Sequence, residues 1–210
     1  TILLTHEASC GSGSHCLAVI RAVTPGAWDT LQVVAELPVG LGPRMVAVSS
    51  DGTTAFVPCG NSGTVNVLQA PDVNSWNAGQ AINTFNLAGQ PSGLAISPDG
   101  RTALVANHDM HRVEVLEAAS ASAWATGAWS NSIPVRRAAR VAFLSGGARA
   151  IVTGATDATD TAAILEAADP NAWGQVASTA SSLSMTGTPF DLVVALPRNR
   201  ALVARFHAGI

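Results

Sequence analysis

The chain has 210 residues, of which 48% are hydrophobic and only 12% are charged, and its net charge is −3. This much apolar surface with so little charge excludes an intrinsically disordered chain, and the acidic balance without any basic run argues against a general nucleic-acid binder. No apolar stretch reaches the roughly 18 residues that a membrane-spanning helix needs, so we expect no membrane insertion.

Four tryptophans mark an internal repeat. They lie 48, 48 and 49 residues apart, and each follows an aliphatic residue by eight positions and an alanine by six. The tryptophans are Trp28, Trp76, Trp124 and Trp173, and the repeated segments before them are residues 19–22, 67–70, 115–118 and 164–167. Self-similarity at a fixed period of this length is typical of proteins built from repeated structural units.

A second repeated block predicts the strands. Its copies are residues 43–57, 91–105, 141–152 and 192–203. Each copy is a short apolar run, a turn and another apolar run, and the pairs Asp51-Gly52 and Asp99-Gly100 suit a tight hairpin turn because glycine tolerates positive φ. A third strand ends in the repeated aliphatic-x-alanine segment, and a fourth follows the tryptophan. Each period of about 48 residues therefore predicts four strands.

Four short antiparallel strands per repeat are typical of a β-propeller blade. We therefore predict an all-β propeller built of four-stranded antiparallel blades, about four of them in this chain. No stretch keeps a helical period, so helices should be minor. The expected repeats are residues 1–42, 43–90, 91–137, 138–188 and a partial 189–210.

One repeat carries a family resemblance. Residues 90–107, which read QPSGLAISPDGRTALVAN, and VEVL at 113–116 resemble the YVTN-type β-propeller repeat, which is related to lactonase-type propellers. The tyrosine of that repeat is replaced here by Phe56, Leu104, Ile151 and Leu202. The resemblance implies six to eight blades, in a fold that hosts lactonases, quinoprotein-like enzymes and binding scaffolds alike.

The strand count bears on how the ring closes. The second strand of the blade occurs five times, whereas the other three strands occur four times each. We therefore expect the chain to be a contiguous portion of a larger propeller, with further blades from the same or another chain covering its open sheet edges. The alternative is a complete four-bladed ring with an overlapping terminal strand.

In a propeller, the loops between the second and third strands of a blade and those between successive blades lie on one rim. We call it the loop rim, and such scaffolded loops usually carry the ligand. All five histidines and all three cysteines fall in these loops. His108-Asp109-x-His111 is the densest donor group, and imidazole and carboxylate groups that converge there can bind a divalent metal such as zinc or calcium. The alternative is that these polar residues only suit turns.

Arginines form a second cluster on the loop rim. Guanidinium groups there can clamp a carboxylate or a phosphate bidentately. The alternative is a solvated loop in a charge-poor protein. Together, the ligand-binding candidates of the rim are His6, Glu7, Arg44, Asn107, His108, Asp109, His111, Arg136, Arg137, Arg140, Asp157 and His207.

The three cysteines are informative about the compartment. Cys10 and Cys16 flank a glycine- and serine-rich loop and are the candidate disulfide pair, which leaves Cys59 over. A disulfide fits an extracytoplasmic protein, secreted or periplasmic, and three free thiols in the cytosol are the alternative. As a nucleophile, Cys59 lacks a recognisable orienting group.

Two functions remain open on this basis. The first is a non-catalytic extracytoplasmic scaffold that binds a protein partner or a small anionic ligand through its rim. The second is a lactonase-like hydrolase acting on a small lactone or sugar acid, with rim histidine and aspartate as base or metal ligands and rim arginine holding the anion. The first is preferred because no pair of candidate catalytic residues has a specific spacing. No cofactor is firmly expected beyond a divalent metal.

Overall fold

The computed structural model describes residues 1–7, 9–10, 14–24, 26–154, 160–175, 177–185, 188–195 and 200–206. Almost all of its regular structure is β-strand. The helices of the described residues are three single 3-10 turns, and none is long or apolar enough to cross a membrane. These turns are η1 (Trp28–Thr30), η2 (Trp76–Ala78) and η3 (Trp124–Thr126).

The strands form five successive antiparallel sheets, each made from neighbouring strands of the chain. Sheet 1 holds β1 (Ile2–His6), β2 (His15–Ala22) and β3 (Leu31–Val39). Sheet 2 holds β4 (Ala47–Val48), β5 (Thr54–Cys59), β6 (Thr64–Gln69) and β7 (Gln80–Asn86). Sheet 3 holds β8 (Pro91–Ile96), β9 (Thr102–Asn107), β10 (Arg112–Glu117) and β11 (Ala128–Pro134). Sheet 4 holds β12 (Ala138–Phe143), β13 (Arg149–Gly154), β14 (Asp160–Ala167) and β15 (Ala177–Met185), and sheet 5 holds β16 (Thr188–Ala195) and β17 (Arg200–Phe206).

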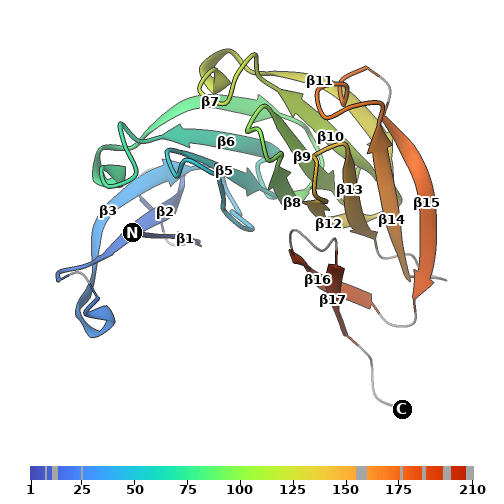
Figure 1. Cartoon of the computed structure of the whole chain (residues 1–210). Coiled ribbons are helices and arrows are strands. Elements are labelled where there is room, and N and C mark those ends of the chain that lie inside the picture. Colours follow the sequence, from blue (N-terminus) through green and yellow to red (C-terminus); the bar gives the residue numbers. More distant parts are fainter. Residues whose placement is uncertain are drawn as a thin grey trace.

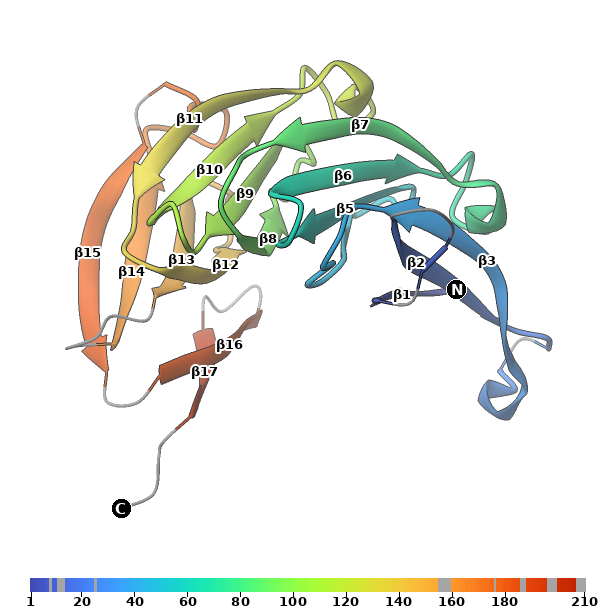
Figure 2. The same cartoon turned by 180° about the vertical axis from the view of Figure 1, so that it is seen from behind.

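The sheets stand side by side along an open arc (Figures 1 and 2). The fourth strands β7, β11 and β15 form its outer edge, and β8 and β12 lie on its inner side. This arrangement of four-stranded antiparallel sheets is a β-propeller-like fold of about four blades, which confirms the predicted fold class.

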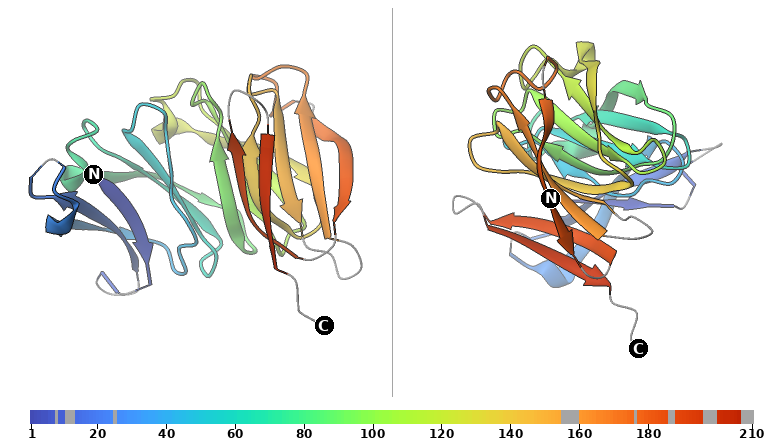
Figure 3. Two further views of the ribbon diagram at one scale, coloured as in Figure 1. Left: turned by 60° about the horizontal axis from the view of Figure 1, so that its bottom comes forward. Right: turned by 90° about the vertical axis from the view of Figure 1, so that its right-hand side faces the viewer.

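Sheets 1 and 5 lie at opposite ends of the arc (Figure 3), and among the described strands none of sheet 1 pairs with β16 or β17. The described strands thus form an open arc and not the closed four-bladed ring of the alternative prediction.

The core lies between the blades. Each cluster of buried apolar side chains combines residues of two adjacent sheets, as where Val57 of sheet 2 packs with Leu17 of sheet 1. Between sheets 2 and 3, the ring of Phe56 meets that of Trp124 edge to face, with centroids 4.6 Å apart. Because strand side chains alternate between faces, one strand can supply both of its flanking interfaces. This explains why the inner strands read as nearly continuous apolar runs.

The Asp-Gly hairpin turns have the expected backbone. Gly52 has φ of +75° and Gly100 has φ of +74°. In the first turn the Asp51 carboxylate accepts hydrogen bonds from the Ser49 hydroxyl at 2.6 Å and from the Thr53 backbone N–H at 3.0 Å. The aspartate thus closes the turn that the glycine makes possible.

Candidate functional site

A pocket of about 410 Å³ opens on the loop rim where three consecutive blades meet. Three of its lining residues, Arg44, His108 and Arg140, are rim candidates from the sequence. Its full lining is Arg44, Gln90, Ser92, His108, Ala139 and Arg140. We call it the rim pocket.

A β-bulge at the start of the inner strand positions this lining. In β8 the pairing with β9 skips Ser92, between Pro91 and Gly93, and in β12 the pairing with β13 skips Ala139. Arg44 has the same position in sheet 2, because Pro43 bridges Cys59 as Pro91 pairs with Asn107. A bulge locally re-aims the side chain of the extra residue, so in sheets 3 and 4 this irregularity places Ser92 and Ala139 at the pocket.

The inner strands of sheets 3 and 4 approach each other closely at this point. A Cβ on Gly93 would lie 2.4 Å from the carbonyl oxygen of Ala139 and 2.7 Å from Cα of Arg140, so only glycine fits there. The Ser92 hydroxyl donates a hydrogen bond to the same Ala139 carbonyl at 3.1 Å. These contacts fix the position of Arg140 relative to Ser92 across the blade boundary.

The pocket is rich in cationic donors. Among the described residues nothing accepts a hydrogen bond from the Arg44 guanidinium, which is exposed a few residues before β4. Arg140 Nε lies 3.7 Å from Asp191 Oδ1 of sheet 5, a long and partly exposed ion pair. Two guanidinium groups in one cavity, of which only one has an acidic neighbour, favour an anionic ligand.

His108 adds a titratable group to the pocket. Its Nδ1 lies 2.9 Å from Asp109 Oδ1, and this hydrogen bond lowers the pKa of the Asp109 carboxyl. Asp109 therefore stays ionised near neutral pH and can hold the His108 ring in one orientation.

Several predicted residues lie elsewhere. Asn107 is fully buried, and its amide donates to the Ala88 carbonyl and to Glu114, both at 3.1 Å, so it lies outside the lining of the rim pocket. His111 is not a free donor either, because its Nδ1 accepts the backbone N–H of Arg137 at 3.2 Å. Arg136 and Arg137 form a turn outside the pocket lining, and Glu7 is exposed directly after β1. Asp157 and His207 lie outside the described residues.

The predicted metal donors His108, Asp109 and His111 do not form a cluster of ligating atoms. The group of three donors that the described residues do bring together is His6, Cys16 and Glu36 in sheet 1. Glu36 was not a candidate, because it stands on the next strand of the sheet, far along the sequence. The structure also joins Cys10 and Cys16 in a disulfide, with Cα atoms 5.7 Å apart.

Gln90 and Ser92 are pocket residues that sequence reasoning missed. The signal for Ser92 was present, because it lies 48 residues after Arg44 at the equivalent place in the next repeat. Gln90 lies just before the same strand, and its carbonyl accepts the backbone N–H of His108 at 3.2 Å.

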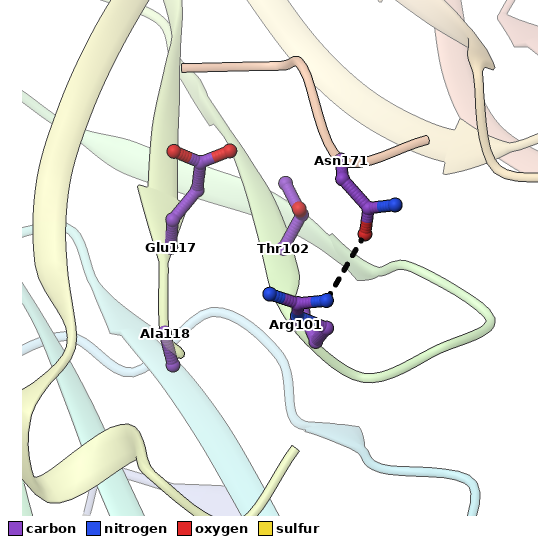
Figure 4. A pocket seen from close by; sticks show the side chains of 5 residues that line it. All are labelled: Arg101, Thr102, Glu117, Ala118 and Asn171. Atoms are coloured by element: carbon purple, nitrogen blue, oxygen red, sulfur yellow. Dashed lines mark hydrogen bonds between the residues drawn. The ribbon is translucent and has the colours of Figure 1, made fainter. Parts of the chain in front are cut away.

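A second, smaller pocket of about 120 Å³ lies between sheets 3 and 4, at the strand ends opposite the loop rim (Figure 4). Arg101 donates a hydrogen bond to Asn171 at 3.4 Å, and the Glu117 carboxylate accepts the backbone N–H of Gly174 at 3.0 Å. Its polar groups thus already bond across the blade boundary. We interpret this pocket as an inter-blade contact.

The fold and the rim pocket together define a β-propeller-like protein with a basic pocket at one rim. No protein-family model and no curated protein matches the chain. Several solved structures do match it, and two of them are named "putative 6-phosphogluconolactonase". The one from Bacteroides uniformis has 16% sequence identity and a TM-score of 0.71, and the match covers 93% of this chain and 62% of that one. The one from Bacteroides fragilis has 15% sequence identity and a TM-score of 0.69, and the match covers 92% of this chain and 58% of that one. Another is the hydrazine synthase of Kuenenia stuttgartiensis (20%, 0.66, 89% and 47%).

The chain spans 47–62% of the length of these structures. At such low identity the similarity concerns the β-propeller fold alone. It assigns no activity to this chain.

Proposed function

We propose that the chain is a binding protein for a small organic anion that carries a phosphate or a carboxylate, held in the rim pocket. The observation that supports this is the convergence of two guanidinium groups on one cavity, those of Arg44 and Arg140, from sheets 2 and 4. The chain as a whole is acidic, so this local excess of cationic groups is not a consequence of composition.

The size of the cavity favours a small ligand over a protein partner. At about 410 Å³ it lies within the roughly 300–1,000 Å³ of ordinary ligand pockets. Gln90 and Ser92 supply neutral polar groups beside the two guanidinium groups. That combination suits a hydroxylated molecule such as a sugar acid or a sugar phosphate.

Hydrolysis of a lactone is the second candidate, and the His108–Asp109 pair at 2.9 Å favours it. A histidine oriented by a carboxylate can remove a proton from the water that attacks a lactone carbonyl. The two solved structures named for 6-phosphogluconolactonase share the fold with this chain. In that case the arginines would hold the phosphate of the substrate.

Calorimetric titration tests the binding proposal, with 6-phosphogluconate and gluconate as anionic probes and glucose as a neutral one. We expect the anions to bind and glucose not to bind. Arg44→Ala and Arg140→Ala should each weaken anion binding about 10- to 100-fold, since a charge-assisted hydrogen bond contributes about 1.5–3 kcal/mol. Arg136→Ala is the matched control, because it removes a rim arginine outside the pocket. Equal losses in all three variants would refute the assignment of the site.

A separate assay decides between binding and catalysis. If the chain is a hydrolase, it should open 6-phosphogluconolactone faster than the spontaneous reaction, and His108→Ala should abolish the excess rate with little change in anion affinity. Anion binding without any excess rate of hydrolysis would refute the second candidate and support binding as the function.

We also propose an extracytoplasmic location. The disulfide between Cys10 and Cys16 supports it, because disulfides persist in oxidising compartments. Mass spectrometry of the native protein, before and after reduction, tests for the bond.

A further inference from the structure

Sheet 1 brings a histidine, a cysteine and a glutamate together on one face. His6 of β1 pairs directly with Cys16 of β2, and Glu36 of β3 pairs with Ala18, two residues further along β2. Residues two apart on a strand share a face, so all three side chains project to the same side of the sheet. The His6 Nε2 and Glu36 Oε1 atoms lie 3.3 Å apart, and the donor atoms of all three residues lie within 4.8 Å of one another.

Cys10 is the fourth potential donor. Its disulfide with Cys16, with a Cα–Cα distance of 5.7 Å, shows that the backbone already holds the two sulfur atoms at one place. Reduction of the bond would leave two thiols beside the histidine and the glutamate. A thiolate, not a disulfide sulfur, is the form that ligates a metal.

We propose that, once the Cys10–Cys16 disulfide is reduced, His6, Cys10, Cys16 and Glu36 bind one divalent metal ion of the zinc type. Two thiolates, an imidazole and a carboxylate are all ligands that Zn²⁺ takes in tetrahedral sites. With bond lengths of about 2.0–2.3 Å, a tetrahedron places its ligand atoms roughly 3.3–3.8 Å apart. The observed limit of 4.8 Å therefore needs a closure of about 1 Å, within the reach of side-chain rotation.

The surroundings of the group leave the proposed site open to solvent on one side. Cys16 is fully buried, whereas His6 is half-buried and Glu36 is exposed. The sheet thus fixes the buried Cys16, and the exposed Glu36 carboxylate can move to bind an ion that enters from solvent. None of these residues lines the rim pocket, so this inference does not depend on the proposed function.

Metal and disulfide exclude each other at this place, which makes the site responsive to redox conditions. When a low-molecular-weight disulfide oxidises the pair, the two protein thiolates lose two electrons in forming the Cys10–Cys16 bond. The small disulfide takes up those electrons and leaves as two thiolates. The ion then loses two of its four ligands and is released as Zn²⁺ without any change in its own oxidation state.

The test counts zinc in the Cys59→Ser variant, which retains no thiol other than the proposed ligands. One sample is kept oxidised and one is reduced with a water-soluble phosphine, and both are equilibrated with buffered Zn²⁺ before native mass spectrometry. We expect one zinc per reduced chain and none per oxidised chain. In the reduced sample Co²⁺ should give the thiolate-to-cobalt charge-transfer band and the visible bands of a tetrahedral ion.

Ligand variants separate this site from adventitious binding to a dithiol. His6→Ala and Glu36→Gln should each lower zinc affinity by at least about tenfold, since each removes one of four ligands. His108→Ala is the matched control, because it removes another rim histidine that has an acidic neighbour, and it should leave the zinc affinity unchanged. Circular dichroism shows whether each variant is folded. If His6→Ala is not folded, Glu36→Gln, which keeps the side-chain shape, still tests the site.

Three results would overturn the proposal. One is equal zinc content in the oxidised and reduced samples. The second is unchanged affinity in both His6→Ala and Glu36→Gln, which would reduce the site to a pair of thiols. The third is the absence of zinc from the reduced protein.

Discussion

The indole Nε1–H of Trp124 donates a hydrogen bond to the carbonyl oxygen of Gly100 at 2.9 Å. Gly100 lies in the hairpin turn between β8 and β9, and Trp124 begins η3, so the bond ties two turns of one blade together at the end opposite the loop rim. The neighbouring blades repeat it, in the pairs Trp76–Gly52 and Trp173–Gly147, both at 2.8 Å. Three of the four spaced tryptophans that reveal the repeat in the sequence, Trp76, Trp124 and Trp173, therefore stabilise the turns of their blades.

Trp124→Phe should destabilise the protein by about 1–3 kcal/mol, because it leaves the Gly100 carbonyl without its donor while it keeps an aromatic ring against Phe56. Trp124→Ala should cost more, about 3–5 kcal/mol, because it also opens a cavity between sheets 2 and 3. Urea unfolding measures both. Leu183→Ala, at an exposed leucine, is the control for loss of apolar surface alone. Equal stability of Trp124→Phe and wild type would contradict the role of the bond.

Glu114 should be the acid whose neutralisation costs most. Its fully buried carboxylate accepts hydrogen bonds from Arg112 at 2.7 Å, Trp129 at 2.9 Å and Asn107 at 3.1 Å. Glu114→Gln removes the charge and one acceptor, so we expect a loss of about 1–3 kcal/mol in the free energy of unfolding.

The matched control is Glu166→Gln, which breaks an exposed ion pair with Arg149. That pair should contribute no more than about 1 kcal/mol, because both partners are solvated. If urea unfolding gave the two glutamine variants the same free energy of unfolding, the hydrogen bonds of the buried Glu114 would contribute no more than the exposed ion pair.

Asp191→Asn should strengthen anion binding in the rim pocket by about two- to fivefold. The carboxylate competes with the ligand for Arg140, and an exposed ion pair of this kind contributes about 0.2–1 kcal/mol. Calorimetric titration with 6-phosphogluconate measures the change, and its size should shrink as salt is added. Glu166→Gln removes the same charge far from the pocket and should have no effect. Weaker binding in Asp191→Asn would show that Arg140 does not hold the anion.

The stability of the protein should fall between about pH 9 and 11. Burial raises the pKa of the Cys59 thiol from 9.0 to about 11. Over that range the unfolded chain releases the proton and the folded chain keeps it, so the free energy of unfolding decreases as pH rises, by about 3 kcal/mol in total.

Few side chains of this protein can ionise between about pH 9 and 11. The sequence has no lysine and no tyrosine, and disulfide-bonded cysteines do not titrate, so Cys59 is the side chain expected to ionise there. Urea unfolding at a series of pH values measures the slope, and Cys59→Ala should lack it. The same slope in the variant would assign the effect to another group.

The sequence by itself determined the blades. The period of the tryptophans, the apolar runs and the Asp-Gly turns predicts the order of the strands, including the five copies of the second strand, which the structure has as β1, β5, β9, β13 and β17. These features are local: a strand needs a short apolar run, and a hairpin turn needs a residue that accepts positive φ.

Only the tertiary structure decided which rim residues meet. Arg44 and Arg140 are 96 residues apart and line one pocket, whereas Arg137 lies three residues before Arg140 and does not. The direction of each side chain depends on the pleat, and a bulge in the inner strand changes that direction by one residue, which the spacing of residues in a sequence does not show. In the same way, Glu36 reaches His6 across the intervening strand through the register of sheet 1, and Asn107 turns into the interior to bond Glu114.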